Sequence, residues 1–250
     1  RICTDIENCA GDTSIALSMI SDDSFYMEMK KDYAPEMVTA FIRLNGATVG
    51  CVANRSEVYT DGEKTATYDA ALTAAGCEKA AAFVNFCNAF EIPVLTLVNV
   101  DGYKNCKCNE KKIAKAAARL TYAFANADVP KVTVVVGKAN GTAGLTMNSK
   151  SIGSDIVYAW KNAKIGVMEA APAVKIMYAD EIAKADNAAA LINEKAAQYN
   201  EMQASALAAA KRGYVDDIIE ASETRQRVVA AFEMLFTKRE DRPSKKHGTI

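Results

Sequence analysis

The stretch from Val132 to Ser149 constrains the fold more than any other part of the chain. It begins with β-branched residues, continues through small residues that include Gly141, Ala143 and Gly144, and ends in a helix-compatible segment. This pattern predicts a buried strand, a tight loop and the start of a helix. Small residues let a ligand approach the backbone, and the first N–H groups of a helix can bind developing negative charge. The stretch is therefore a candidate oxyanion hole.

Helix and strand patterns alternate on both sides of this stretch. Asn45-Gly46 lies between two short apolar runs, which predicts a hairpin. Farther along, helix, strand, helix and strand are expected over 77–90, 94–100, 110–127 and 132–136, with two short strands over 156–160 and 164–168. The alternation favours an α/β fold in which helices cross between parallel strands.

The segment 180–212 is rich in Ala, Glu, Lys and Gln, and it is expected to be helical with breaks near Asp186-Asn187 and Gly213. It is either a solvated amphipathic helix pair or an arm that packs in an oligomer. After a strand over 214–219, Ser222-x-x-Arg225 is expected to open a final helix.

Composition limits what the chain can be. With 250 residues, 50% of them hydrophobic, it can bury a substantial core, and we expect one folded domain over residues 1–250. The net charge of -1 and the pI near 6.0 argue against nucleic acid or an anionic membrane surface as the main partner. Its apolar runs are shorter than the roughly 20 residues of a membrane span, so we expect no direct membrane insertion.

Cysteine usage favours a reducing, cytoplasmic compartment. The chain has seven cysteines, an odd number, and several lie in apolar or helical patterns rather than in a spaced disulfide framework. Cys106 and Cys108 form a C-x-C pair in a polar loop, but no second pair lies nearby and the only histidine is His247. Because structural zinc normally needs four protein ligands, free thiols are favoured and no metal site is expected.

Several segments, in one order, resemble the carboxyl-terminal half of a biotin-dependent acyl-CoA carboxyltransferase β chain of the crotonase superfamily, the propionyl-CoA, methylmalonyl-CoA or acetyl-CoA carboxylase type. The resemblance covers nearly the whole chain, and the family's amino-terminal half is expected to be absent. Beyond the 132–149 stretch, the resembling segments are 22–25, 41–46, 49–54, 79–83, 86–93, 129–131, 153–155, 213–225 and 239–243.

The resemblance implies a crotonase-like spiral of ββα units with carboxyl-terminal helices, in which the strands 94–100 and 132–136 are neighbours. It implies that the chain is the biotin-facing half of an enzyme that moves a carboxyl group between carboxybiotin on a carrier protein and an acyl-CoA. The implied partners are a biotin carboxyl carrier protein and a crotonase-like acyl-CoA-binding subunit, in a homo- or hetero-oligomer. Biotin and a coenzyme A thioester are the implied cofactor and substrate.

The resemblance also implies site residues. The backbone N–H groups of Thr142 and Ala143, after Gly141, correspond to the oxyanion hole for the ureido oxygen of biotin. Such donors accelerate a reaction because they stabilise charge only where it develops. Gly144 and Leu145 follow them in the implied biotin and substrate pocket, where the apolar Leu145 favours an apolar wall.

Gly102, Tyr103 and Lys115 complete the implied substrate-binding set, but the chain departs from the family there. Val100-Asp-Gly-Tyr103 replaces Val-Pro-Gly-Phe, and Lys115-Ala-Ala117 replaces Arg-His-Gly. Lys115 can supply a point charge but not a bidentate fork, or it belongs to a solvated helix face. Thr142 stands where the family usually has glycine, which a backbone donor tolerates if the φ angle of Thr142 is negative.

Three alternatives to a carboxylating enzyme stay open. The same half serves decarboxylases that transfer a carboxyl group from an acyl-CoA onto biotin. The altered residues 101–117 and Thr142 are also compatible with a catalytically degenerate structural subunit. A self-contained crotonase-like hydratase or hydrolase is less favoured, since Asp180 and Glu181 are poorly placed to be its acidic catalytic residues.

Overall fold

The computed structural model describes residues 3–60, 62–185 and 187–240. The strands are β1 (Tyr26–Glu28), β2 (Met37–Leu44), β3 (Ala47–Asn54), β4 (Glu57–Thr60), β5 (Glu63–Thr67), β6 (Ala71–Leu72), β7 (Val94–Val100), β8 (Gly102–Tyr103), β9 (Lys131–Asn140), β10 (Ile156–Trp160), β11 (Lys164–Gly166) and β12 (Asp217–Ile219). The α-helices are α1 (Thr13–Ile20), α2 (Ala74–Ala89), α3 (Lys107–Asn126), α4 (Gly141–Thr146), α5 (Ala170–Met177), α6 (Ala179–Lys184), α7 (Ala188–Tyr199), α8 (Ala206–Lys211) and α9 (Thr224–Met234).

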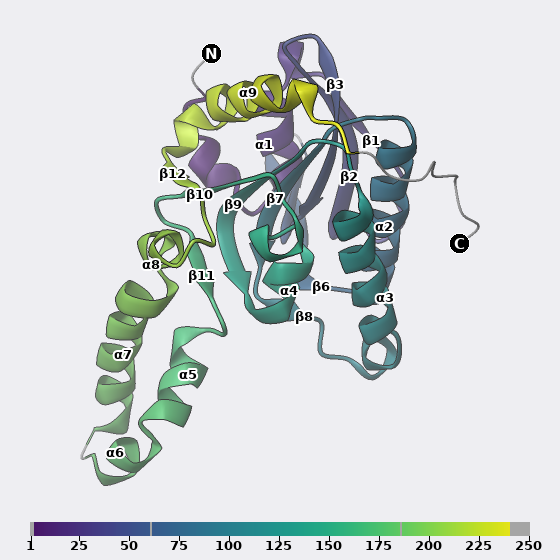
Figure 1. The fold of residues 1–250 in the computed structure, drawn as a ribbon. Coiled ribbons are helices and arrows are strands. Elements are labelled where there is room, and N and C mark those ends of the chain that lie inside the picture. Colours follow the sequence, from purple (N-terminus) through teal and green to yellow (C-terminus); the bar gives the residue numbers. More distant parts are fainter. Residues whose placement is uncertain (1–2, 61, 186, 241–250) are drawn as a thin grey trace.

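A mixed sheet with the strand order β1-β2-β3-β7-β9-β10-β12 forms the centre of the molecule (Figure 1). Strands β1, β2 and β3 are antiparallel, and β3, β7, β9, β10 and β12 are parallel. Asn45 and Gly46 join β2 to β3 with φ angles of 54° and 80°, so the predicted hairpin is confirmed. The predicted neighbours β7 and β9 pair in parallel from Val94 and Lys131 onward.

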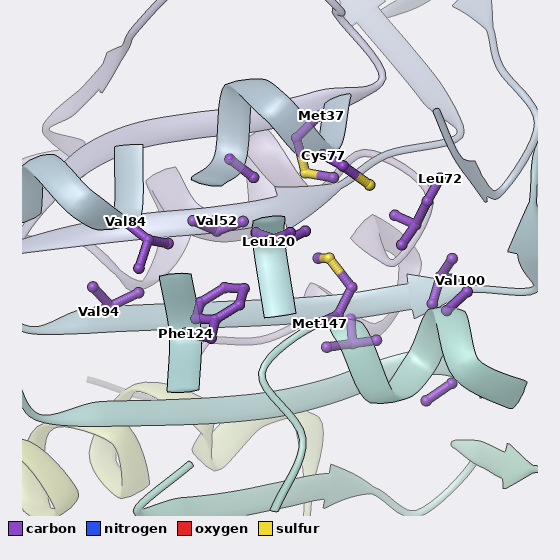
Figure 2. Packing of buried hydrophobic residues seen from close by; sticks show 14 of the residues in the cluster. Met37, Val52, Leu72, Cys77, Val84, Val94, Val100, Leu120, Phe124 and Met147 are labelled. Carbon is purple, nitrogen blue, oxygen red and sulfur yellow. The ribbon is translucent and has the colours of Figure 1, made fainter. Parts of the chain in front are cut away.

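Helices cover both faces of the sheet. On one face, Leu120 and Phe124 of α3 and Val84 of α2 pack onto Val52 and Val94 of the strands, and Figure 2 shows this cluster. On the other face, α1 and α9 pack on the sheet through a second cluster, which includes Leu17, Ile20, Val228 and Ala231. The central strands are consequently buried on both sides, as the continuous apolar runs of parallel strands require.

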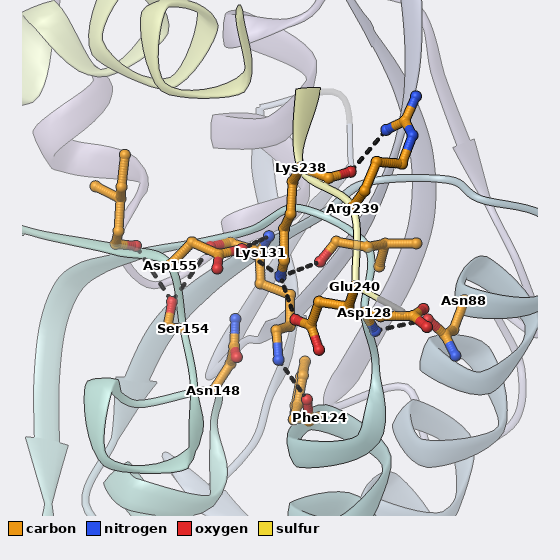
Figure 3. Close-up of polar contacts among 12 residues, drawn as sticks. Asn88, Phe124, Asp128, Lys131, Asn148, Ser154, Asp155, Lys238, Arg239 and Glu240 are labelled. Atoms are coloured by element: carbon orange, nitrogen blue, oxygen red, sulfur yellow. Dashed lines mark hydrogen bonds and ion pairs between the residues drawn. The ribbon is translucent and has the colours of Figure 1, made fainter. Parts of the chain in front are cut away.

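Hydrogen bonds from the carboxyl-terminal region fix the start of β9 (Figure 3). The Asp155 carboxylate accepts from the backbone N–H of Lys131 at 2.8 Å and from the Lys238 ammonium at 3.0 Å. Lys238 also donates to the carbonyl of Val129, and the buried Lys131 ammonium donates to the carbonyl of Phe124 at 2.7 Å. The residues after α9 therefore hold the point where the chain enters β9.

Three expectations need correction or comment. Strand β9 continues to Asn140 and leads directly into α4, so the tight loop expected after Val136 is wrong. The reason is that residues 138–140 pair with β11 and extend the ladder. Helix α5 was not expected from the sequence. Residue 186, where a helix break was proposed, lies outside the described residues, and so do His247 and residues 241–243.

Helices α5 to α8 form an arm that extends from the sheet on the side of β11 (Figure 1). A π-helical turn over Asn200–Ala204 separates α7 from α8. In the part of the chain that the structure describes, no helix combines the length and apolar character that crossing a bilayer would require.

Candidate functional site

Glycines make the direct connection between β9 and α4 possible. Gly141 has a φ angle of +58°, in the left-handed region that other residues avoid, and a Cβ there would lie 3.0 Å from the carbonyl oxygen of Val167. A Cβ on Gly144 would lie 2.7 Å from the carbonyl carbon of Ala139. The close approach of α4 to the end of β9 therefore depends on both residues lacking a side chain.

The N–H groups of Thr142 and Ala143 have no assigned acceptor among the described residues. Helix α4 begins at Gly141, so these N–H groups precede the first donors of the intrahelical pattern. They donate in none of the turn, cap or side-chain hydrogen bonds. Thr142 is exposed and is absent from the non-glycine residues with positive φ, so threonine is tolerated at this position. Two backbone donors are thus without an assigned partner at this turn, one from the exposed Thr142 and one from the buried Ala143.

A cavity of about 570 Å³ opens beside the turn. Its rim includes Gly141, Thr142, Gly144 and Leu145, and Leu145 has 45% of its surface exposed. The floor consists of apolar side chains from the sheet and from the end of α4: Val98, Val135, Met147, Val157 and Ile165. Met147 is also packed in the core cluster (Figure 2), which anchors the end of α4 beneath the cavity.

Part of the cavity lining is polar. Thr133 and Ser149 line it, and the Ser149 hydroxyl is buried with no hydrogen-bond partner among the described residues. Behind them, the side-chain amide nitrogen of Asn148 donates to Thr133 Oγ1 at 2.9 Å, while its Oδ1 also has no partner in the described part of the chain. Burying such groups without partners costs free energy, and both oxygens are enclosed by protein atoms rather than open to the cavity.

The outer wall of the cavity comes from the arm. Tyr199, Gln203 and Arg212 line it together with Tyr214. Arg212 donates to the backbone carbonyl of Gln203 at 2.9 Å and to its side-chain oxygen, which holds the π-helical turn against the end of α8. These wall residues are not among the residues predicted from the sequence. The signal that points to them is the π-helical turn, a feature frequent at functional sites.

Asp101 has a positioning role in this chain. Its carboxylate accepts from the Lys138 ammonium at 3.0 Å and from the Asn140 side-chain amide at 3.2 Å, which ties the residue after β7 to the end of β9. Burial lowers the pKa of Lys138, but its hydrogen bonds to Glu169 and Asp101 outweigh burial and raise the pKa above the ordinary value. The ammonium therefore stays charged and keeps its contact with Asp101.

The structure brings some of the remaining predicted residues toward the turn and leaves others away from it. The Tyr103 hydroxyl lies 3.1 Å from Thr146 Oγ1 of α4, so β8 packs against the helix that carries the candidate donors. Gly102 precedes it, with open space where a side chain would be. Lys115 is exposed on α3, and the described lining of the cavity contains neither it, Gly102, Tyr103 nor the buried Ala143.

Groups of three or more His, Cys, Asp or Glu side chains able to hold a metal ion do not occur among the residues that the structure describes.

Residues 4–250 match the model of the carboxyl transferase domain, and the chain belongs to that family. It is 40% identical over 240 residues to the methylmalonyl-CoA carboxyltransferase 12S subunit of Propionibacterium freudenreichii subsp. shermanii, a match that covers 96% of this chain and 44% of the relative. It is also 40% identical over 241 residues to the methylmalonyl-CoA decarboxylase subunit alpha of Propionigenium modestum, covering 94% and 44%. The chain thus spans less than half the length of these relatives.

Solved structures agree with this membership. The transcarboxylase 12S structure described as a hexamer assembly, with hydrolysed methylmalonyl-coenzyme A bound, superposes with a TM-score of 0.85 at 41% identity, covering 95% of this chain and 44% of that chain. The geranyl-CoA carboxylase beta subunit of P. aeruginosa superposes with a TM-score of 0.76 at 24% identity, covering 95% and 44%, and shows the shared fold. The predicted crotonase-like fold and family resemblance are therefore confirmed.

Proposed function

We propose that the chain is the biotin-facing half of an acyl-CoA carboxyltransferase, which moves a carboxyl group between biotin on a carrier protein and an acyl-CoA. The observation that carries this proposal is the pair of uncommitted N–H groups, those of Thr142 and Ala143, at a turn beside an apolar cavity. The single domain expected over residues 1–250 is part of this proposal. A reducing, cytoplasmic location is also proposed, and it is supported by seven free cysteines.

The residues present fit biotin. The cavity of about 570 Å³ is lined by apolar side chains and by polar residues that include Ser149, Lys150 and Arg212, and biotin is a ring system with apolar and polar edges. When bound, biotin would supply the nitrogen that carries the carboxyl group. Leu145 and the floor residues would exclude water from the reacting groups, which strengthens hydrogen bonds made there.

The proposed role of Thr142 and Ala143 is electrostatic. Two backbone N–H groups directed at an oxygen that gains negative charge during transfer would lower the barrier, because they bind that charge more tightly than the neutral ground state. Backbone donors held by Gly141 and Gly144 need no reorganisation during the reaction. The turn geometry would then be the main contribution of this chain to catalysis.

Thr142→Pro tests this role, because proline removes one N–H group and is compatible with the first turn of a helix. Losing one oxyanion donor is expected to lower the transfer rate by about 10²–10³-fold. The assay follows labelled carboxyl transfer from methylmalonyl-CoA to biocytin in the complex purified with its acyl-CoA-binding partner. Thr142→Gly, which keeps the N–H, is the matched control and should stay within a few-fold of the wild type.

Circular dichroism and thermal unfolding of both variants show whether the fold survives the substitution. A folded Thr142→Pro variant that transfers at the wild-type rate would exclude the oxyanion role of this residue.

We propose that the active assembly also contains a biotin carboxyl carrier protein and a crotonase-like acyl-CoA-binding subunit, in a homo- or hetero-oligomer. The support is that the chain is 40% identical to a carboxyltransferase 12S subunit, and that the solved 12S structure is described as a hexamer assembly and a multienzyme core. Co-purification from the native source, followed by mass spectrometry, identifies the partners. A stable monomer that turns over acyl-CoA with free biotin and no partner would contradict the split arrangement.

Decarboxylation of an acyl-CoA is the second candidate function. The chain is as similar to a decarboxylase subunit alpha as to a carboxyltransferase subunit, at 40% identity to each. The release of CO2 distinguishes the two directions. The assembled enzyme is given methylmalonyl-CoA and no reagent that carboxylates its biotin, and release of CO2 would then indicate decarboxylation. A folded, fully assembled complex without transfer in either direction would support the degenerate structural subunit instead.

A further inference from the structure

Two cysteines lie side by side at the start of α3, outside the candidate cavity. The Sγ atoms of Cys106 and Cys108 are 3.0 Å apart. Cys108 is exposed and Cys106 is partly exposed, whereas four of the other five cysteines are buried. The exception is the partly exposed Cys9. The pair is therefore the one place among the described residues where two thiols are both in contact and accessible to a small reagent.

Backbone hydrogen bonds hold the segment on both sides of the pair. Before it, the N–H of Lys104 donates to the carbonyl of Leu72 at 2.9 Å. After it, the side chain of the buried Asn109 makes two hydrogen bonds. Its Nδ2 donates to the carbonyl of Lys104 at 2.7 Å, and its Oδ1 accepts from the N–H of Ala74 at 2.7 Å. The carbonyl of Cys106 accepts from the N–H of Asn109 at 2.9 Å. The two thiols are thus positioned by the fold, and little conformational entropy is lost when they react.

The electrostatic surroundings favour the thiolate of Cys106. Its pKa is lowered by hydrogen bonds from the Cys108 thiol and from the backbone N–H of Asn109, with Lys104 nearby. Cys9 differs, because burial and the carboxylates of Asp12 and Asp5 raise its pKa. Burial also raises the pKa of the core thiols, to about 12 at Cys77 and Cys87. Since the thiolate is the reactive form, Cys106 is the preferred nucleophile.

We propose that Cys106 and Cys108 form a reversible thiol–disulfide modification site, which hydroperoxides or small-molecule disulfides oxidise in preference to the other five cysteines. Accessible thiols of low pKa beside a second, resolving cysteine are the arrangement found in redox-sensitive sites. This site lies outside the proposed carboxyl transfer chemistry and does not depend on it.

The oxidation balances with the named reagents. With hydrogen peroxide, the Cys106 thiolate attacks one oxygen and forms a sulfenic acid while hydroxide leaves; Cys108 sulfur then attacks Cys106 sulfur, and a second hydroxide leaves as the disulfide forms. The two thiol protons convert the hydroxides to water. With glutathione disulfide, Cys106 forms a mixed disulfide and releases one glutathione thiolate, and attack by Cys108 releases the second. Thiols in excess reverse both reactions.

Trypsin gives the pair a specific signature. Cleavage after Lys104, Lys107 and Lys111 places Cys106 in the peptide 105–107 and Cys108 in the peptide 108–111. The reduced full-length chain is treated with hydrogen peroxide or glutathione disulfide, its free thiols are alkylated in denaturant, and the digest is analysed by mass spectrometry. The two peptides are expected to appear joined by a disulfide, and to separate after reduction.

Kinetics and variants complete the test. Cys106 should be oxidised faster than Cys9, because its lowered pKa gives it the larger thiolate fraction. Cys108→Ser should prevent the joined peptides and accumulate the glutathione mixed disulfide on Cys106, while Cys9→Ser should leave the reaction unchanged. Oxidation of Cys9 before the pair, or joined peptides only after unfolding, would overturn the proposal.

Discussion

The central sheet and the helical arm contribute opposite walls to one cavity, and they are stabilised in different ways. In the sheet, Leu97 of β7 is 1% exposed and packs in the core that α1 and α9 share. In the arm, Ile176 of α5 and Met202 of the π-helical turn are 71% and 69% exposed. The described part of α6 and α7 contains no buried residue. The outer part of the arm, α6 and α7, is therefore held by few buried contacts, whereas α8 at its base joins the core of the sheet through Ala206 and Ala209.

Truncating a sheet residue should have the largest effect. Leu97→Ala removes a buried side chain from β7 and is expected to lower the free energy of unfolding by about 2–5 kcal/mol, because a cavity remains in the core. Leu207→Ala in α8, where the leucine is 56% exposed, is the matched control and should change it by less than about 0.5 kcal/mol. Urea unfolding of both variants measures this contrast. Similar losses at the two positions would mean that the arm is as well packed as the sheet.

A buried lysine makes the sheet side sensitive to pH. Lys79 of α2 is 2% exposed and donates to the carbonyls of Met37 and Ala34 at 2.7 and 3.3 Å. Burial lowers its pKa from 10.5 to about 8, although nearby Glu28 opposes this. The unfolded chain therefore binds the proton more tightly between these pH values, and stability should rise as pH increases from 8 to 10.5.

This second prediction corresponds to a rise on the order of 3 kcal/mol across the window, since one pKa unit is worth about 1.4 kcal/mol. Urea unfolding of the wild type and of Lys79→Met at several pH values isolates the contribution of Lys79 to this rise. Burial raises the pKa of Tyr26 above its ordinary value, so its contribution has the opposite sign, and the comparison of the two proteins subtracts it. Parallel pH dependences in the two proteins would show that Lys79 does not titrate in this window.

Sequence patterns predicted the sheet better than the cavity. The strand over 94–100 and the Asn45-Gly46 hairpin follow from local apolar runs and turn residues. The end of β9 could not be predicted from such patterns, because a glycine such as Gly137 is typical of a loop. In the structure a Cβ on Gly137 would overlap the side-chain oxygen of Asn99, so this glycine is needed for packing within a strand.

Some residues of the candidate site could likewise be predicted from a local sequence pattern, and others could not. Gly141, Thr142, Gly144 and Leu145 are consecutive or nearly so, and a small-residue cluster after a strand was enough to predict their grouping. The wall residues such as Arg212 lie far away in sequence, in a helical segment whose composition indicates only solvation or oligomer contact. Their position depends on how the arm packs against β11, which no local pattern encodes.

Gly144→Ala should have an intermediate effect, at the boundary between the two regions. The new Cβ would meet the backbone of Ala139 at 2.7 Å, and backbone cannot move as a flexible side chain does. We expect a loss of about 1–3 kcal/mol in the free energy of unfolding, and reduced carboxyl transfer because α4 is displaced from the end of β9. Gly102→Ala, with open space at its Cβ, is the control and should be near neutral. Equal behaviour of the two variants would mean that the turn tolerates displacement.

The smallest effect on stability is expected in the arm. A double substitution there also tests whether the arm is a solvated helix pair or packs in an oligomer. Ile176→Gln combined with Met202→Gln changes two exposed apolar side chains, so the free energy of unfolding should stay within about 0.5 kcal/mol per site. If the arm packs in an oligomer, burial of these side chains stabilises association, and light scattering of the variant should show weaker assembly at equal concentration. Unchanged assembly would identify the arm as a solvated helix pair. A large loss of stability in the isolated chain would instead show that these side chains pack against its own core, and the contrast between sheet and arm would fail.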